Sequence, residues 1–225
     1  GDPRVGGLTP ANDLDDGACT PSHCSLREAI MAVNSAAPAP PASGPTGARA
    51  AAAEGVAVIR LPNNLPGGEI TLTSALPPLS ASVSIEGPGA TQLTINANGS
   101  TGSPRRVFRI TGGATVSITG LRLTGGVAAG GGGIAVDGGS QLTLTDSRID
   151  RNQSTTGGGG GIQVQDESHV QLEDVRITDN WTSGANSPGG GLSVVTGASA
   201  TMRNGVISGN SVTSGWGGGI RVFNG

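Results

Sequence analysis

Hydrophobic and polar residues alternate along most of this chain in short runs that recur at a nearly fixed spacing. A glycine run followed by an aliphatic residue occurs four times, with the aliphatic residue at Ile134, Ile162, Leu192 and Ile220, a period of 28, 30 and 28 residues. Alternation with a period of two predicts strands that are buried on one face. A repeat of this length, without a helical pattern, predicts one turn of a parallel β-helix.

A second phrase repeats in step with the glycine runs, and each complete copy ends on an asparagine. The copies cover residues 142–152, 170–180 and 200–210, and residues 116–123 form a degenerate earlier copy. Stacking of successive turns places the asparagines Asn152, Asn180 and Asn210 in one column. We predict that they form a ladder in which each amide bonds to the next turn, in preference to the alternative that they bind a ligand.

The N-terminal part is the least repetitive and contains a helical pattern. Ser25 and Glu28 have the spacing of a capping box, in which each side chain bonds to the backbone of the other residue. One apolar stripe follows at helical spacing, formed by Leu26, Ala29, Ile30 and Val33. We predict a short amphipathic α-helix that covers the N-terminal end of the β-helix, where an open turn would expose unpaired backbone.

The two cysteines of the chain, Cys19 and Cys24, are close enough for a small disulfide loop, with free thiols or a metal pair as alternatives. A disulfide would indicate an oxidising compartment. Three nearby acids, Asp13, Asp15 and Asp16, are weak candidates for a calcium site. They do not occupy alternate positions through a full loop, and an Asp-capped turn is the more ordinary explanation. We expect no resident cofactor, with Ca²⁺ as the alternative.

Residues 15–30 read Asp-Asp-Gly-Ala-Cys-Thr-Pro-Ser-His-Cys-Ser-Leu-Arg-Glu-Ala-Ile. This segment resembles the N-terminal motif of a large family of bacterial surface-exposed, right-handed parallel β-helix proteins that is often named after the letters CSLREA. The likeness continues through residues 59–62, 70–73 and 107–110 and through the glycine repeats. The repeats are also similar to the Gly-Gly-Ala-Ile and Phe-x-x-Asn pair of chlamydial polymorphic outer-membrane adhesins, with Gly in place of Ala and Ile in place of Phe.

The resemblance implies an extracellular or cell-surface location in a bacterium, and it implies a fold without specifying an activity. We expect three parts: an N-terminal cap with a disulfide and a helix at 1–34, a Pro/Ala-rich loop at 35–55, and a β-helix at 56–225. The fold class is all-β, a right-handed, single-stranded parallel β-helix of about six to seven turns. The last glycine run lies within an unfinished turn without a polar cap, so we expect a truncated β-helix that continues in a longer chain.

The composition of the 225-residue chain limits the classes of partner that we expect. Its net charge is −3, its 13 basic residues are all arginines, and 41 residues are glycine. Because no basic face is visible, we expect no nucleic-acid partner. Because no run of about 18 apolar residues occurs, we expect no membrane span in this segment. The expected partners are a host- or neighbour-surface protein or glycan, and the remainder of a longer chain.

Two acidic residues recur at the repeat spacing and are the alternative candidates for catalysis. Asp146 lies 28 residues before Asp174, which precedes Asn204 by 30, so the three should stack. Two stacked carboxylates suit a retaining glycosidase pair or a Ca²⁺ site. Arg148 and Arg176 repeat in the same register, however, and a solvated face of ion pairs explains the charges at least as well. We therefore assign no catalytic residue.

Trp181 and Trp216 lie in the variable corners between the asparagines and the following glycine runs. Corners carry the binding variation of repeat proteins, and an exposed Trp suits a sugar or protein ligand. Packing of each Trp against its own turn is an equally good explanation. Our first hypothesis is a non-enzymatic scaffold or adhesin-like module. The alternative is a polysaccharide lyase or glycoside hydrolase, which requires a groove lined by at least two acids and an arginine.

Overall fold

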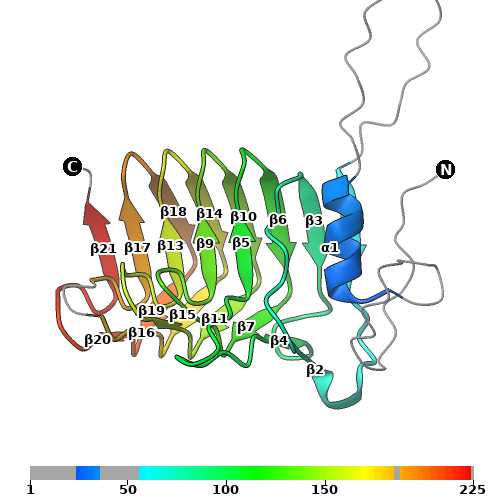
Figure 1. Ribbon diagram of the computed structural model, residues 1–225, viewed down its shortest axis with the longest axis horizontal. Coiled ribbons are helices and arrows are strands. Elements are labelled where there is room, and N and C mark those ends of the chain that lie inside the picture. Colours follow the sequence, from blue (N-terminus) through cyan, green and yellow to red (C-terminus); the bar gives the residue numbers. More distant parts are fainter. Residues whose placement is uncertain (1–23, 36–55, 185–187, 224–225) are drawn as a thin grey trace, which may run out of the picture.

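A computed structural model describes residues 24–35, 56–184 and 188–223. It shows strands stacked along one axis, with a single helix at one end of the stack (Figure 1). Several predicted features fall outside these residues. They are Cys19 of the predicted disulfide, the calcium candidates Asp13, Asp15 and Asp16, and residues 36–55 of the predicted Pro/Ala-rich loop.

The strands form four parallel sheets, and within each sheet the spatial order of the strands follows the chain. The first sheet contains β1 (Ala57–Arg60), β3 (Val83–Glu86), β6 (Thr115–Thr119), β10 (Gln141–Thr145), β14 (His169–Glu173) and β18 (Ser199–Arg203). The second contains β2 (Glu69–Thr71), β4 (Thr94–Asn96), β7 (Arg122–Thr124), β11 (Arg148–Asp150), β15 (Arg176–Thr178) and β19 (Val206–Ser208). A short 3₁₀ turn, η1 (Pro66–Gly68), precedes β2.

The other two sheets complete each turn of the β-helix. The third contains the two-residue strands β8 (Val127–Ala128), β12 (Gln153–Ser154), β16 (Trp181–Thr182) and β20 (Ser211–Val212). The fourth contains β5 (Phe108–Ile110), β9 (Ile134–Val136), β13 (Ile162–Val164), β17 (Leu192–Val195) and β21 (Ile220–Phe223). From β6 onward the chain visits the four sheets in the same order once per turn, as the repeat predicted.

The register follows the repeat spacing from Val116 onward. Leu142 of β10 aligns with Val116 of β6 and with Val170 of β14. In the second sheet, Ile149 aligns with Ile177 of the following turn. With six strands in each of the two longest sheets, the chain makes about six turns. The predicted all-β parallel β-helix is thereby confirmed.

The core is a continuous column of aliphatic side chains inside the stack. In the early turns this column includes nine large buried side chains: Leu61, Leu72, Leu79, Val83, Ile85, Leu93, Ile95, Phe108 and Ile110. Val58 and Ile70 are half-buried. Each fully buried aliphatic side chain contributes about 1.5–3 kcal/mol, so burial shared between turns is the main stabilising term.

Helix α1 (Leu26–Ser35) lies at the N-terminal end of the stack (Figure 1). Its capping box forms as predicted: the Glu28 N–H donates to Ser25 Oγ at 3.2 Å, and the Ser25 N–H donates to Glu28 Oε2 at 2.6 Å. The predicted apolar stripe is buried, namely Leu26, Ala29, Ile30 and Val33. The helix therefore supplies the apolar cover that the first turns lack.

Polar contacts fix the helix on the strand stack. The Arg27 guanidinium donates to the carbonyl oxygens of Ala75 at 2.6 Å and Ser74 at 3.0 Å. The Asn34 amide donates to the Pro78 carbonyl at 2.7 Å. At the opposite end of the stack, four apolar side chains are exposed: Val206, Ile220, Val222 and Phe223. No helix in the described part of the chain is long and apolar enough to cross a membrane.

The glycines of the repeated run meet two kinds of backbone requirement, as the run at 159–161 shows. Gly159 has a φ of 65°, a left-handed conformation that is costly for residues with a Cβ atom. A Cβ on Gly160 would lie 2.6 Å from the Gly190 oxygen, and a Cβ on Gly161 would lie 2.7 Å from the Gly191 oxygen. The glycines are therefore needed because a tight corner places consecutive turns in close contact.

Candidate functional site

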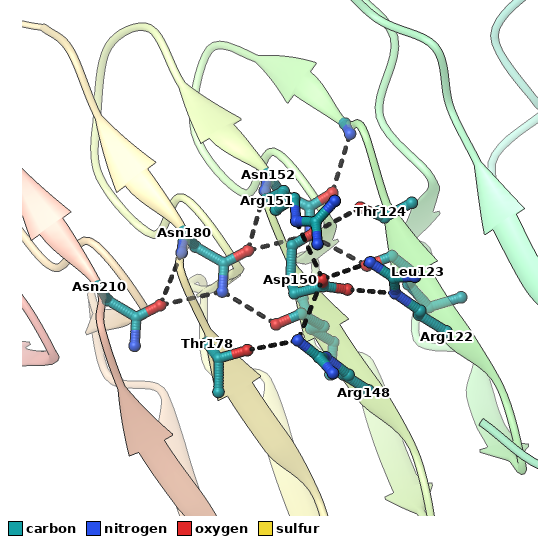
Figure 2. Close-up of polar contacts among 12 residues, drawn as sticks. Arg122, Leu123, Thr124, Arg148, Asp150, Arg151, Asn152, Thr178, Asn180 and Asn210 are labelled. Carbon is teal, nitrogen blue, oxygen red and sulfur yellow. Dashed lines mark hydrogen bonds and ion pairs between the residues drawn. The ribbon is translucent and has the colours of Figure 1, made fainter. Parts of the chain in front are cut away.

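The predicted asparagines form one hydrogen-bonded column inside the corners that follow the second sheet (Figure 2). The Asn152 side chain donates to Asn180 Oδ1 at 3.0 Å, and the Asn180 side chain donates to Asn210 Oδ1 at 3.0 Å. The same oxygens accept the backbone N–H groups of Asn152 and Asn180. We call Asn152, Asn180 and Asn210 the asparagine ladder. Its amides satisfy corner backbone that water does not reach, which is a structural role.

Asp150 lies beside the ladder at the centre of an ion cluster that the sequence analysis missed (Figure 2). Its fully buried carboxylate accepts two hydrogen bonds from Arg122, Nε to Oδ1 at 2.8 Å and Nη2 to Oδ2 at 2.7 Å. Arg148 and Arg151 approach Oδ2 at 3.4 and 3.6 Å. The hydrogen bond to Asp150 raises the pKa of Arg122. One sequence signal was present: Asp150 is a charged residue at a repeat position that is threonine in the neighbouring turns, Thr124 and Thr178.

We expect Asp150→Asn to lower the free energy of unfolding by about 2 kcal/mol. The amide keeps the shape of the side chain but removes its charge, and its NH₂ group cannot accept from Arg122. Urea unfolding followed by circular dichroism measures the loss. The matched control is Asp146→Asn, an exposed site expected to change stability by less than about 0.5 kcal/mol. Equal effects of the two variants would contradict a structural role for the Asp150 cluster.

Arginines form a column across the second sheet. Arg148 aligns with Arg122 of the preceding turn and with Arg176 of the following turn. The equivalent position is Thr94 in the turn before the column and Val206 in the turn after it. Consecutive parallel strands lie about 4.8 Å apart, so the guanidinium groups originate at that spacing along the axis of the β-helix.

Asp146 and Asp174 occupy the corners between the first and second sheets. Their φ angles are 47° and 55°, and Asn204 has 50° at the equivalent position of the next turn. Asp and Asn tolerate this left-handed conformation better than other residues with a side chain, which is a structural reason for their recurrence. Both aspartates are exposed. They stack as the repeat spacing predicted.

The predicted face of ion pairs is not present among the described residues. Asp146 and Asp174 form no ion pair within this part of the chain, and Arg148 turns to Asp150 instead. Glu173 and Arg203 are aligned across β14 and β18, yet they too form no ion pair. A shared register fixes the spacing of the backbones, whereas exposed side chains gain little by pairing in water.

A groove of about 490 Å³ runs along the edge between the first two sheets. We call it the Asp/Arg groove, and nine residues line it: Ala90, Thr91, Thr94, Arg122, Asp146, Ser147, Arg148, Asp174 and Arg176. Ala90 and Thr91 belong to the long corner that precedes β4, so they lie at the N-terminal end of the groove. The stacked acids and the arginine column therefore meet in one concave surface.

Comparison with protein families gives a match to the model described as a right-handed β-helix region, over residues 80–225. The chain belongs to this family. The handedness predicted from the sequence is thus confirmed. Searches of curated proteins and of solved structures found no significant match.

Within this right-handed β-helix, the two acids of the Asp/Arg groove are arranged differently from the catalytic pair of a retaining glycosidase. A retaining glycosidase places its nucleophile and its general acid on either side of the scissile bond. Asp146 and Asp174 instead occupy equivalent corners of consecutive turns, so both approach a ligand from one side. Both are exposed, whereas a general acid needs a desolvated setting. Together with the arginines, they offer a row of hydrogen-bond acceptors beside a row of donors.

The two tryptophans of the β-helix occupy different positions in their turns. Trp181 is half-buried in β16, where it aligns with Gln153 and Ser211. Trp216 is 82% exposed in the corner after β20. Both lie on the edge formed by the third and fourth sheets, away from the residues that line the Asp/Arg groove. They do not repeat at one register position, so they form no column along the β-helix.

A second ion pair fixes the fourth sheet. Arg109 donates to Asp137 at 2.9 Å, and Thr111 donates to the same carboxylate at 2.6 Å. Although burial alone would raise the pKa of Asp137, these hydrogen bonds hold it below its ordinary value. Burial lowers the pKa of Arg106 to about 10, and this side chain donates to the Gly130 and Gly131 carbonyls. These contacts are structural.

The described residues contain no group of three or more His, Cys, Asp or Glu side chains that could hold a metal ion. Asp13, Asp15 and Asp16 lie outside these residues, as does Cys19, so the calcium alternative and the disulfide stay predictions. Cys24 is buried just before α1.

Proposed function

We propose that this chain is a non-enzymatic segment of a bacterial extracellular or cell-surface protein, in which the β-helix is a rigid scaffold that presents an adhesin-like binding surface. The observation that carries this proposal is the unbroken register of the stacked turns. From β6 onward every sheet continues from turn to turn, and the asparagine ladder satisfies the corner backbone. Such a stack holds surface side chains at fixed intervals, which suits binding of an extended partner.

The proposed location rests on the N-terminal motif at residues 15–30. Its resemblance to the CSLREA group of surface β-helix proteins supports an extracellular setting, and a Cys19–Cys24 disulfide would agree with it. The repeats, similar to those of chlamydial polymorphic outer-membrane adhesins, support a binding role. The proposed partners are a surface protein or a glycan of a host or a neighbouring cell.

A polysaccharide lyase or glycoside hydrolase is the second candidate function. One observation favours it: the Asp/Arg groove contains two acids and three arginines, as such an enzyme requires. The one-sided approach and the exposure of Asp146 and Asp174 favour binding without cleavage.

A cleavage assay separates the two functions. The purified chain is incubated with neutral and acidic polysaccharides, and new reducing ends and the ultraviolet absorbance of unsaturated products are followed. We expect no turnover above a heat-denatured control. Cleavage that is lost in Asp146→Asn or Asp174→Asn, while Asp166→Asn remains active, would overturn the non-enzymatic proposal. Asp166 is a suitable control because it is exposed, has a φ of 54° and lies outside the groove.

A further inference from the structure

We propose that the Asp/Arg groove is a binding site for an acidic polysaccharide lying along the axis of the β-helix. In this site Arg148 and Arg176 bind carboxylate or sulfate groups, and Asp146 and Asp174 accept hydrogen bonds from hydroxyl groups. The inference rests on the proposed binding function and names its ligand class.

The arginines differ in their capacity for a ligand. Arg122 is committed to Asp150 through two short hydrogen bonds. Arg148 shares the same carboxylate at a longer distance, 3.4 Å, and makes a long contact of 3.5 Å with Thr178 Oγ1. Arg176 is exposed and has no ion pair within the described residues. Asp150 therefore neutralises one end of the column, while Arg176 keeps its charge and donors available.

The mixed charge of the groove selects among anionic ligands. A guanidinium group binds a carboxylate or a sulfate through paired hydrogen bonds. The exposed carboxylates of Asp146 and Asp174 repel a ligand that carries only anions, but they accept hydrogen bonds from hydroxyl groups. An acidic polysaccharide carries both anionic groups and hydroxyl groups, which recur every few atoms along its chain. Inorganic polyphosphate carries a dense row of anionic groups without such hydroxyl groups along the chain.

Two other polymers fit the groove poorly. Single-stranded nucleic acid is bound through bases stacked on aromatic side chains, and no aromatic residue lines the groove. An extended peptide binds by adding a strand to a free sheet edge. The strands β7, β11 and β15 beside the groove already pair with neighbours on both sides.

The repetition of the site predicts how affinity depends on ligand length. Equivalent Asp and Arg residues recur on consecutive turns about 4.8 Å apart, so a longer chain meets more of them. Ala90 and Thr91 in the long corner line the N-terminal end of the groove. A monosaccharide reaches only one step of the column. Affinity should therefore rise from monosaccharide to oligosaccharide and then level off once the groove is filled.

Isothermal titration with the whole chain tests the proposal, using oligogalacturonates, chondroitin sulfate oligosaccharides, dextran and inorganic polyphosphate as probes. We expect binding of one or both acidic glycans, no binding of dextran, and weaker binding of polyphosphate. Arg176→Ala should weaken glycan binding about tenfold or more, because a charge-assisted hydrogen bond is lost. The control Arg203→Ala, an exposed arginine outside the groove, should bind as the unchanged chain does. Thermal unfolding confirms that each variant folds.

The double variant Asp146→Asn, Asp174→Asn supplies the second arm. It should bind polyphosphate several-fold more tightly than the unchanged chain, because the repulsion is removed. The proposal is overturned if neither acidic glycan binds, if Arg176→Ala and Arg203→Ala behave alike, or if polyphosphate binds as tightly as the glycans. Absence of binding leaves the scaffold function standing. Binding followed by cleavage would overturn the non-enzymatic function while supporting the site.

Discussion

Asn180→Ala is expected to lower the free energy of unfolding by about 3–5 kcal/mol, the largest loss that we anticipate for a single polar side chain in this β-helix. The Asn180 amide donates to the Ile149 carbonyl and to Asn210 Oδ1, each at 3.0 Å. Its Oδ1 accepts from the backbone and the side chain of Asn152, also at 3.0 Å. Alanine removes all four bonds and leaves buried partners unsatisfied, which costs more than the bonds themselves.

Urea unfolding followed by circular dichroism measures this loss, and Trp181, next to Asn180 in the chain, provides a fluorescence signal from the same turn. The matched control is Gln171→Ala, which truncates an exposed amide of the same turn and should change stability by less than about 0.5 kcal/mol. A loss below about 1 kcal/mol for Asn180→Ala would show that water replaces the amide, contrary to its complete burial.

Gly161→Ala is expected to cost about 3 kcal/mol, although it adds a single methyl group. The new Cβ would lie 2.7 Å from the Gly191 oxygen and 3.0 Å from both Asn180 Nδ2 and Ile177 Cγ2. The oxygen belongs to the backbone of the next turn, so relief of the overlap requires the two turns to separate. That separation stretches the hydrogen bonds from Gly161 to the next turn and weakens the asparagine ladder.

Gly102→Ala is the control for this substitution. Nothing lies within 4 Å of a Cβ at Gly102, whose φ is not in the left-handed range. The substitution should leave stability unchanged or raise it by up to about 1 kcal/mol, because alanine restricts the unfolded chain. Thermal and urea unfolding compare the two variants. Similar midpoints would mean that the corner at Gly161 is loose enough to relax, against the close contact described above.

The sequence predicted the fold well because the period carries the information. A turn of 28 to 30 residues cannot bury its own apolar face, so its neighbours must stack in register, and this placed Leu142 over Val116 and Asn180 over Asn152. The capping box at Ser25 and Glu28 was predictable for a similar reason, since it depends on residues three apart in one helix.

The candidate site was only half visible in the sequence. The stacking of Asp146 and Asp174 followed from the spacing, but their partners did not. Asp150 drew no prediction from the sequence, yet its carboxylate is fully buried next to the inward Ile149. Arginines from three positions cover it, and one of them, Arg151, is at a left-handed corner with a φ of 53°.

The sequence by itself determined the architecture of this protein: a capped β-helix with glycine corners and an inner column of asparagines. These features follow from local backbone needs and from repetition, which the order of residues records directly. Only the tertiary structure decided that Arg122 is committed to Asp150 while Arg176 stays available, and that acids and arginines share one groove. The reason is physical. Register fixes backbone spacing, whereas the partner of a long side chain depends on rotamers and on burial in three dimensions.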